Sequence, residues 1–113
     1  MSELTESKIQ RAIAAYLDVA LPADSFWTAI NPVPGKSIVA AVTSKAMGMK
    51  AGVPDILILH NSVTLWIEIK KERGFLSKTQ KALHVDIVCA GGNAYTARSI
   101  EDVQEILREW EII

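Results

Sequence analysis

The hydrophobic positions near the N-terminus follow a helical period. Over about residues 5–21 an apolar residue recurs at every fourth position, which is typical of a helix with one buried face. Pro22 ends this helix, because proline disfavours the helical conformation of the residue before it. Glu6 lies three residues before the first apolar position and is therefore expected beside the apolar stripe. The stripe consists of Ile9, Ile13, Leu17 and Leu21.

The middle of the chain carries strand patterns. Residues 26–30 form a short apolar run that ends at residues 31–35, which are rich in proline and glycine. Residues 55–60 are almost continuously apolar, as in a strand that is buried on both faces. After a tight turn at 61–62, residues 63–70 alternate between apolar and polar. We therefore expect the strands at 55–60 and 63–70 to form an antiparallel hairpin.

Helix and strand patterns alternate in the last third of the chain. Ser77 and Gln80 have the spacing of a capping box and open a helix over about 77–90, which a glycine pair ends. A strand at 93–97 and a helix at about 100–110 follow. The segment 36–52 is ambiguous: its apolar start fits a strand or a helix, and the rest favours a loop. The order α-β-β-β-α-β-α predicts an α/β fold with a mixed β-sheet flanked by helices.

Three charged residues are expected to meet on one side of this hairpin. Strand side chains alternate between faces, so Glu68 and Lys70 share a face. A turn at Asn61 and Ser62 places Asp55 close to opposite Glu68. Two adjacent carboxylates repel each other unless a cation neutralises them, and oxygen ligands suit Mg²⁺ or Mn²⁺. With a lysine ammonium that stabilises negative charge, the group suits metal-assisted hydrolysis of a phosphodiester.

Length and composition narrow the class of protein. The 113 residues, half of them hydrophobic, suit one globular domain over 1–113. The only cysteine, Cys89, excludes an intrachain disulfide, is expected to be buried, and fits a reducing cytoplasmic location. No secretory pattern opens the chain, and no apolar run approaches the roughly 20 residues that span a bilayer. We therefore expect no membrane association.

The net charge of −1 conceals an uneven distribution along the chain. Residues 36–81 carry eight basic and three acidic residues, a net charge of +5. The flanking segments 1–35 and 82–113 have net charges of −2 and −4. Because the basic segment surrounds Asp55 and Glu68, the composition is compatible with a polyanionic substrate such as DNA.

The charged residues resemble the signature of the PD-(D/E)xK nucleases. Pro54-Asp55 followed by Glu68-Ile69-Lys70 matches that signature, and other residues are similar to one branch, the VRR-NUC domain. These further matches, spread over nearly the whole chain, are Glu6, Gly48, Gly52-Val53, Trp66-Ile67, Gly74-Phe75-Leu76-Ser77 and Gln80. The resemblance implies a restriction-endonuclease-like core and a metal-dependent DNA endonuclease. It further implies the stand-alone type of phages and prophages, which resembles Holliday-junction resolvases and pairs as a homodimer on branched DNA.

The resemblance also implies roles for individual residues. Asp55 and Glu68 would hold Mg²⁺ or Mn²⁺ together with the backbone carbonyl of Ile69, and Glu6 would lie near the metal, directly or through water. Lys70 would orient the attacking water and stabilise the transition state. The catalytic residues implied are Glu6, Asp55, Glu68, Lys70 and Gln80. The DNA-binding residues expected in the basic segment are Lys45, Lys50, Lys71, Arg73, Ser77 and Lys78.

Several of these residues also have a simpler interpretation. Glu68 and Lys70 can form a solvent-facing strand pair, Glu6 suits the first turn of any helix, and Gln80 suits a capping box alone. His84, one turn after Gln80, is expected on the helix surface or half-buried rather than in a phosphate-binding or proton-transfer role. The basic residues can be ordinary surface charges. Two other functions therefore stay open: a non-catalytic DNA-binding domain, and a protein-interaction domain of a repair or packaging complex.

Overall fold

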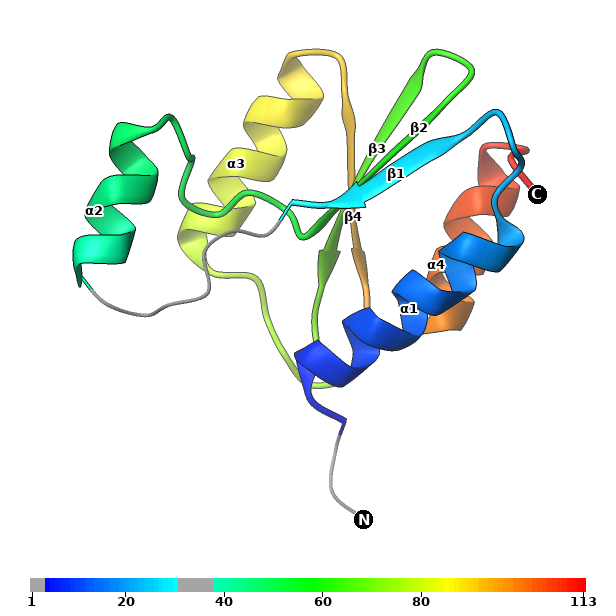
Figure 1. Ribbon diagram of the computed structural model, residues 1–113, viewed down its shortest axis with the longest axis horizontal. Coiled ribbons are helices and arrows are strands. Elements are labelled where there is room, and N and C mark those ends of the chain that lie inside the picture. The colour runs from blue at the N-terminus through cyan, green and yellow to red at the C-terminus, as the bar shows by residue number, and fades with distance from the viewer. Residues whose placement is uncertain (1–3, 31–37) are drawn as a thin grey trace.

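A four-stranded mixed sheet lies at the centre of the protein, with helices on both sides (Figure 1). The computed structural model describes residues 4–30 and 38–113. The neighbouring strands are, in order, β1 (Phe26–Ala29), β2 (Ile56–His60), β3 (Val63–Ile69) and β4 (Asn93–Ala97). The first two pairs are antiparallel, and β3 pairs with β4 in parallel. The predicted α/β class with a mixed sheet is therefore confirmed.

The helices divide between the two faces of the sheet. They are α1 (Glu6–Ala20), α2 (Ile38–Ala46), α3 (Lys78–Cys89) and α4 (Ile100–Glu109). Helices α1 and α4 lie together on one face, and α3 lies on the other, where it forms the crossover between the parallel strands β3 and β4 (Figure 1). Ser77 and Ser99 cap α3 and α4 through their side chains, as their positions in the sequence predict.

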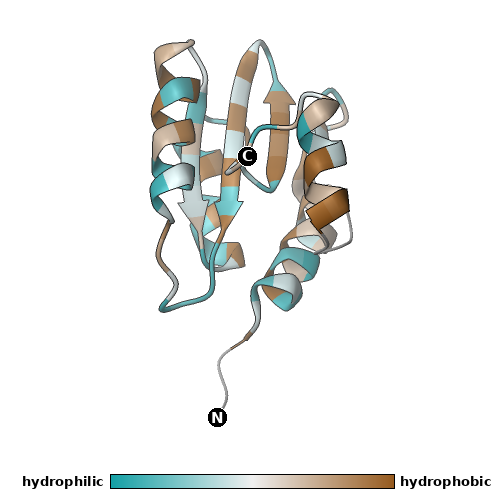
Figure 2. Ribbon diagram, turned by 90° about the vertical axis from the view of Figure 1, so that its left-hand side faces the viewer, coloured by the Kyte–Doolittle hydropathy of each residue, from teal (hydrophilic) through white to brown (hydrophobic). Residues whose placement is uncertain are grey.

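The hydrophobic core lies between the sheet and the pair α1 and α4. Ile13 and Leu17 of α1 are completely buried, and so are Leu65 and Ile67 of β3. Hydrophobic positions recur along the strands, whereas the helices mix hydrophobic and hydrophilic positions (Figure 2). Because alternate residues of β3 enter this core, Trp66 and Glu68 face the opposite side, toward α3.

A two-residue turn joins β2 and β3. Asn61 and Ser62 both have positive φ, 48° and 68°, which is the backbone of a type I′ hairpin turn. This turn fixes the register, in which Ile56 pairs with Ile67. The predicted hairpin and its turn are therefore confirmed.

Three details differ from the expectations or lie beyond them. The ambiguous segment contains a helix, α2, so the order α-β-β-β-α-β-α lacks one element. No α2 residue is buried, so the sequence has no amphipathic stripe that would identify this helix. Cys89 was expected to be buried and is exposed, because it lies on the outer side of α3. The proline-rich turn at 31–35 lies outside the described residues.

Candidate active site

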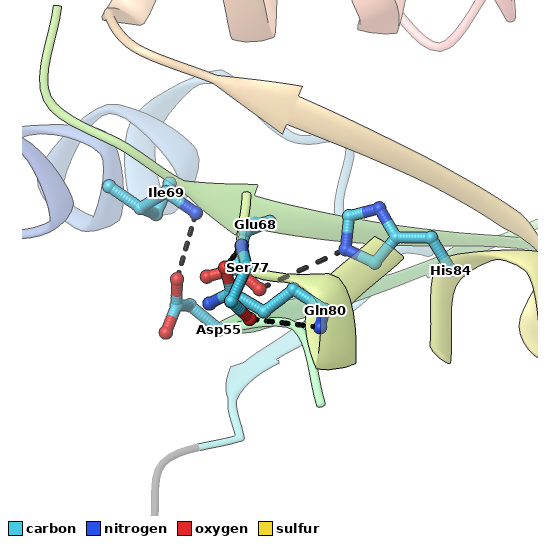
Figure 3. Close-up of polar contacts among 6 residues, drawn as sticks. All are labelled: Asp55, Glu68, Ile69, Ser77, Gln80 and His84. Atoms are coloured by element: carbon cyan, nitrogen blue, oxygen red, sulfur yellow. Dashed lines mark hydrogen bonds and ion pairs between the residues drawn. The ribbon is translucent and has the colours of Figure 1, made fainter. Parts of the chain in front are cut away.

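The hairpin register brings Asp55 and Glu68 together. Ile56 pairs with Ile67, so Asp55, one residue before β2, lies opposite Glu68. A hydrogen bond orients the Asp55 side chain, because the backbone N–H of Ile69 donates to its Oδ2 at 2.8 Å (Figure 3). The N–H and C=O of one extended residue point to the same side of the strand. The Ile69 carbonyl therefore points toward the side on which Asp55 lies.

Glu68 is the buried charged residue of the described structure, with 3% of its surface exposed. Burial raises the pKa of Glu68 from 4.5 to about 9, and the hydrogen bond and charge repulsion from Asp55 act in the same direction. Lys70 acts in the opposite direction, because its positive charge favours the ionised carboxylate. At neutral pH and without a cation, Glu68 therefore keeps its proton.

Glu6 and Lys70 complete the charged group from two other directions. Glu6 begins α1, and its Oε2 accepts a hydrogen bond of 3.4 Å from the backbone N–H of Lys71 just beyond β3. Its negative charge raises the pKa of Glu68, which places it within electrostatic reach of that carboxyl group. The structure thus brings Glu6, Asp55, Glu68 and Lys70 together around one end of β3.

Gln80 acts as a helix cap in this structure. Its Oε1 accepts a hydrogen bond from the backbone N–H of Ser77 at 2.9 Å, and Ser77 Oγ accepts from the backbone N–H of Gln80 at 3.1 Å (Figure 3). This reciprocal pair is the capping box predicted from the spacing. The side-chain carbonyl of Gln80 is therefore occupied by the capping box. The catalytic role expected for Gln80 stays a prediction.

A close backbone contact links the start of α3 to the segment that carries Asp55. A Cβ atom on Gly52 would lie 2.9 Å from the carbonyl oxygen of Thr79, and Gly52 has a φ of +84°. Only glycine combines this backbone conformation with so close an approach. Gly52 therefore lets the loop before Asp55 pack directly on the first turn of α3.

The oxygen atoms of the site fit a hard divalent cation. One atom, Oε1 of Glu68, is buried without a hydrogen-bond partner among the described residues. A cation would relieve both this unsatisfied atom and the repulsion between the two carboxyl groups. Within residues 4–30 and 38–113, no three Asp, Glu, His or Cys side chains converge as a metal cluster. The available donors are the Asp55 and Glu68 carboxylates and the Ile69 carbonyl, with Glu6 within electrostatic reach of Glu68.

The predicted DNA-binding residues lie at the surface, but in two places. Lys71 and Arg73 lie in the loop after β3, and Ser77 and Lys78 lie at the start of α3. Lys45 and Lys50 belong to the end of α2 and the loop after it. Arg98, which no sequence pattern pointed to, donates a 2.9 Å hydrogen bond to the carbonyl of Gly74 and so holds the loop after β3.

His84 of α3 lies close to the buried carboxyl group of Glu68. Its Nε2 lies 3.8 Å from Oε1 of Glu68, and burial lowers its pKa below the usual value of 6.5 (Figure 3). From the sequence, a surface or half-buried position was favoured over a phosphate-binding or proton-transfer role. The contact depends on where the crossover helix crosses β3, which local sequence does not encode.

Comparison with known proteins supports the fold. No family profile matches the sequence, and no curated protein matches it. Among solved structures, a "VRR_NUC domain protein" is 22% identical, with a TM-score of 0.75 over 99% of this chain and 93% of that one. A second structure, a "VRR_NUC domain", is 19% identical, with a TM-score of 0.66 over 95% of this chain and 99% of the other. The chain therefore has the fold of these VRR_NUC domain structures, the family that its signature residues resemble.

Proposed function

We propose that this protein is a metal-dependent endonuclease that hydrolyses phosphodiester bonds in DNA, with Mg²⁺ or Mn²⁺ as its cofactor. The observation that carries the proposal is the pairing of Asp55 with Glu68, beside Lys70, at one end of the central strand. A buried carboxyl group is costly, and a protein retains it where it serves a purpose that an apolar residue cannot. The VRR_NUC fold of the solved neighbours supports the same conclusion.

The residues of the site have distinct tasks in this proposal. Asp55 and Glu68 hold the cation with the Ile69 carbonyl, and the Ile69 N–H keeps Asp55 in position. The cation, when bound, polarises a phosphate oxygen and lowers the pKa of water. Lys70 orients the attacking water and stabilises the negative charge that develops on the phosphate. Glu6 acts from α1 through water near the cation.

The surface around the site suits a nucleic acid backbone. Lys71 and Arg73 follow the catalytic strand directly, and Lys78 lies in the first turn of α3. Backbone N–H groups at a helix start favour phosphate, so Ser77 and Lys78 can bind one phosphate between them. Lys45 and Lys50 extend the positive surface beyond α3. Branched DNA is the substrate that we propose, as the resemblance to junction resolvases implies.

A homodimer is part of the same proposal. Val85 and Val88 of α3 are 60% and 55% exposed, and no residue of the apolar helix α2 is buried. An apolar helix without a buried face is expected to be covered in the working protein. A second copy of this chain would cover it and bring two sites to one DNA junction, whose two cleaved strands are equivalent.

A panel of labelled DNA structures tests the catalytic proposal. Purified protein is incubated with duplex, single-stranded, flapped and four-way-junction DNA, each with Mg²⁺, Mn²⁺ or EDTA. We expect metal-dependent cleavage, fastest on the four-way junction, and none with Asp55→Asn. DNA binding without cleavage would favour a non-catalytic DNA-binding domain. Absence of DNA binding at low salt would favour a protein-interaction domain.

Light scattering after size exclusion tests the homodimer. The wild-type protein is expected at twice the mass of the chain, and Val85→Lys is expected at the mass of one chain. Val19→Lys is the matched control, because Val19 is 87% exposed on α1, on the opposite side of the sheet. A monomeric wild-type protein would contradict this part of the proposal.

A further inference from the structure

His84 and Glu68 form a buried polar contact that the proposed function does not use. The two side chains are 12% and 4% exposed, and they come from different elements, α3 and β3. The 3.8 Å between Nε2 and Oε1 is beyond hydrogen-bond distance. Both atoms are buried without a hydrogen-bond partner among the described residues. A buried polar atom without a hydrogen bond costs free energy, and each of these two atoms is a suitable hydrogen-bond partner for the other.

The direction of His84 follows from the helix pattern of α3. Gln80, Leu83, His84 and Ile87 are the partly buried residues of this helix that recur at three- and four-residue spacing, so they form its sheet-facing stripe. The helix has no fully buried residue, so its contact with the sheet is limited. Within this stripe His84 places its Nε2 3.8 Å from Oε1 of Glu68, to which an N–H at that nitrogen can donate (Figure 3).

We infer that His84 is a positioning residue, whose Nε2–H donates to Oε1 of Glu68 and so presents the other oxygen toward Asp55, where the cation would be held. This inference rests on the proposed metal site. Nε2 of His84 and Oε1 of Glu68 are buried 3.8 Å apart with no other hydrogen-bond partner among the described residues, so a small shift of the imidazole would bring them within hydrogen-bond distance. Partners of this kind orient a metal-binding side chain without touching the metal.

Calorimetric titration of the full chain with Mn²⁺, without DNA, tests the inference. His84→Leu removes the N–H and keeps an apolar side chain, and we expect its affinity for Mn²⁺ to fall by about tenfold or more. His84→Gln keeps an N–H donor at similar reach and should recover most of the affinity. Leu83→Ala is the matched control, since it disturbs the same stripe without removing a polar contact, and should bind Mn²⁺ as the wild type does.

The outcomes separate the inference from the proposed function. If wild-type protein binds Mn²⁺ and His84→Leu binds it equally well, the positioning role is wrong and the metal site stands. Equal loss in His84→Leu and His84→Gln would also overturn it, because packing would then explain both. If wild-type protein does not bind Mn²⁺, the metal site and the inference fail together. Should His84→Leu not fold, His84→Ala takes its place, with thermal melting as the check of folding.

Discussion

The backbone N–H of Ile69 donates a 2.8 Å hydrogen bond to Oδ2 of Asp55. Strand β3 therefore contributes more than the Glu68 side chain to the candidate site, since its backbone also orients the carboxylate of Asp55, which precedes β2. Asp55 has its position set by the hairpin register and its rotamer set by this bond. The two carboxyl groups are consequently held together before any cation binds, which adds to the rise in the pKa of Glu68 that burial mainly causes.

The raised pKa of Glu68 predicts how stability depends on pH. The pKa is about 9 in the folded protein against 4.5 ordinarily, so the folded state holds this proton more tightly than the unfolded chain. The resulting stabilisation is complete below the ordinary value and is lost as the pH rises toward the folded value. With EDTA present, we expect the melting temperature of the wild type to fall through this window relative to that of Glu68→Gln. Parallel curves for the two proteins would contradict the assignment.

Lys70→Ala is predicted to separate cleavage from binding. Loss of the ammonium removes a charge that acts on the transition state, so cleavage should fall by about 100-fold or more. Affinities for DNA and Mn²⁺ should change little, as measured by fluorescence anisotropy and calorimetry. Lys81→Ala, on an exposed position of α3, is the control and should cleave normally. Retained turnover in Lys70→Ala would remove the central catalytic role of this residue.

Gly52→Ala and Gly48→Ala form a matched pair for the contact between α3 and the Asp55 loop. Both glycines have positive φ, so alanine at either position costs about 1–2 kcal/mol of conformational energy. At Gly48 the added Cβ has nothing within 4 Å, whereas at Gly52 it lies 2.9 Å from the Thr79 carbonyl oxygen. Urea unfolding should therefore show a larger loss for Gly52→Ala. Equal losses would mean that the close approach is easily relaxed.

Ser77→Ala and Gln80→Ala distinguish the two interpretations of Gln80. Each substitution removes half of the capping box, so each should lower the free energy of unfolding by about 1 kcal/mol. If Gln80 also acts at the site, Gln80→Ala should lose cleavage activity that Ser77→Ala keeps. Single-turnover cleavage at saturating enzyme makes this comparison independent of affinity. Equal activity in the two variants would leave Gln80 with its structural role.

The salt dependence of DNA binding tests the basic surface. For duplex DNA, log K should fall against log salt with a slope of about −0.9 for each phosphate contact. Lys71→Ala should weaken binding to every DNA structure and make the slope less steep by about one contact. Lys8→Ala is the control, because Lys8 lies exposed on α1 outside the basic segment. A flat salt response in the wild type would count against a DNA substrate.

The sequence predicted those parts of the structure that local patterns encode. The alternation of β3 and the turn at Asn61 and Ser62 were sufficient to pair Asp55 with Glu68, because strand geometry relates the two positions directly. Helix α2 could not be predicted with the same patterns, because its apolar residues are not buried within the chain and form no amphipathic stripe. The contact of His84 with Glu68 was missed for a different reason. It joins two elements through the placement of a crossover helix, which no short segment specifies.

The candidate site requires a turn of fixed length at Asn61 and Ser62 as strictly as it requires its acidic residues. One residue inserted there would shift the pairing of β2 with β3 by one position, or displace the whole of β3 along its axis. A strand that kept its apolar residues in the core would then carry Glu68 away from Asp55. Substitutions on the exposed helix faces can therefore be tolerated. Insertions and deletions at the turn of Asn61 and Ser62 should be selected against as strongly as changes in the site itself, although the turn lies at the other end of the hairpin.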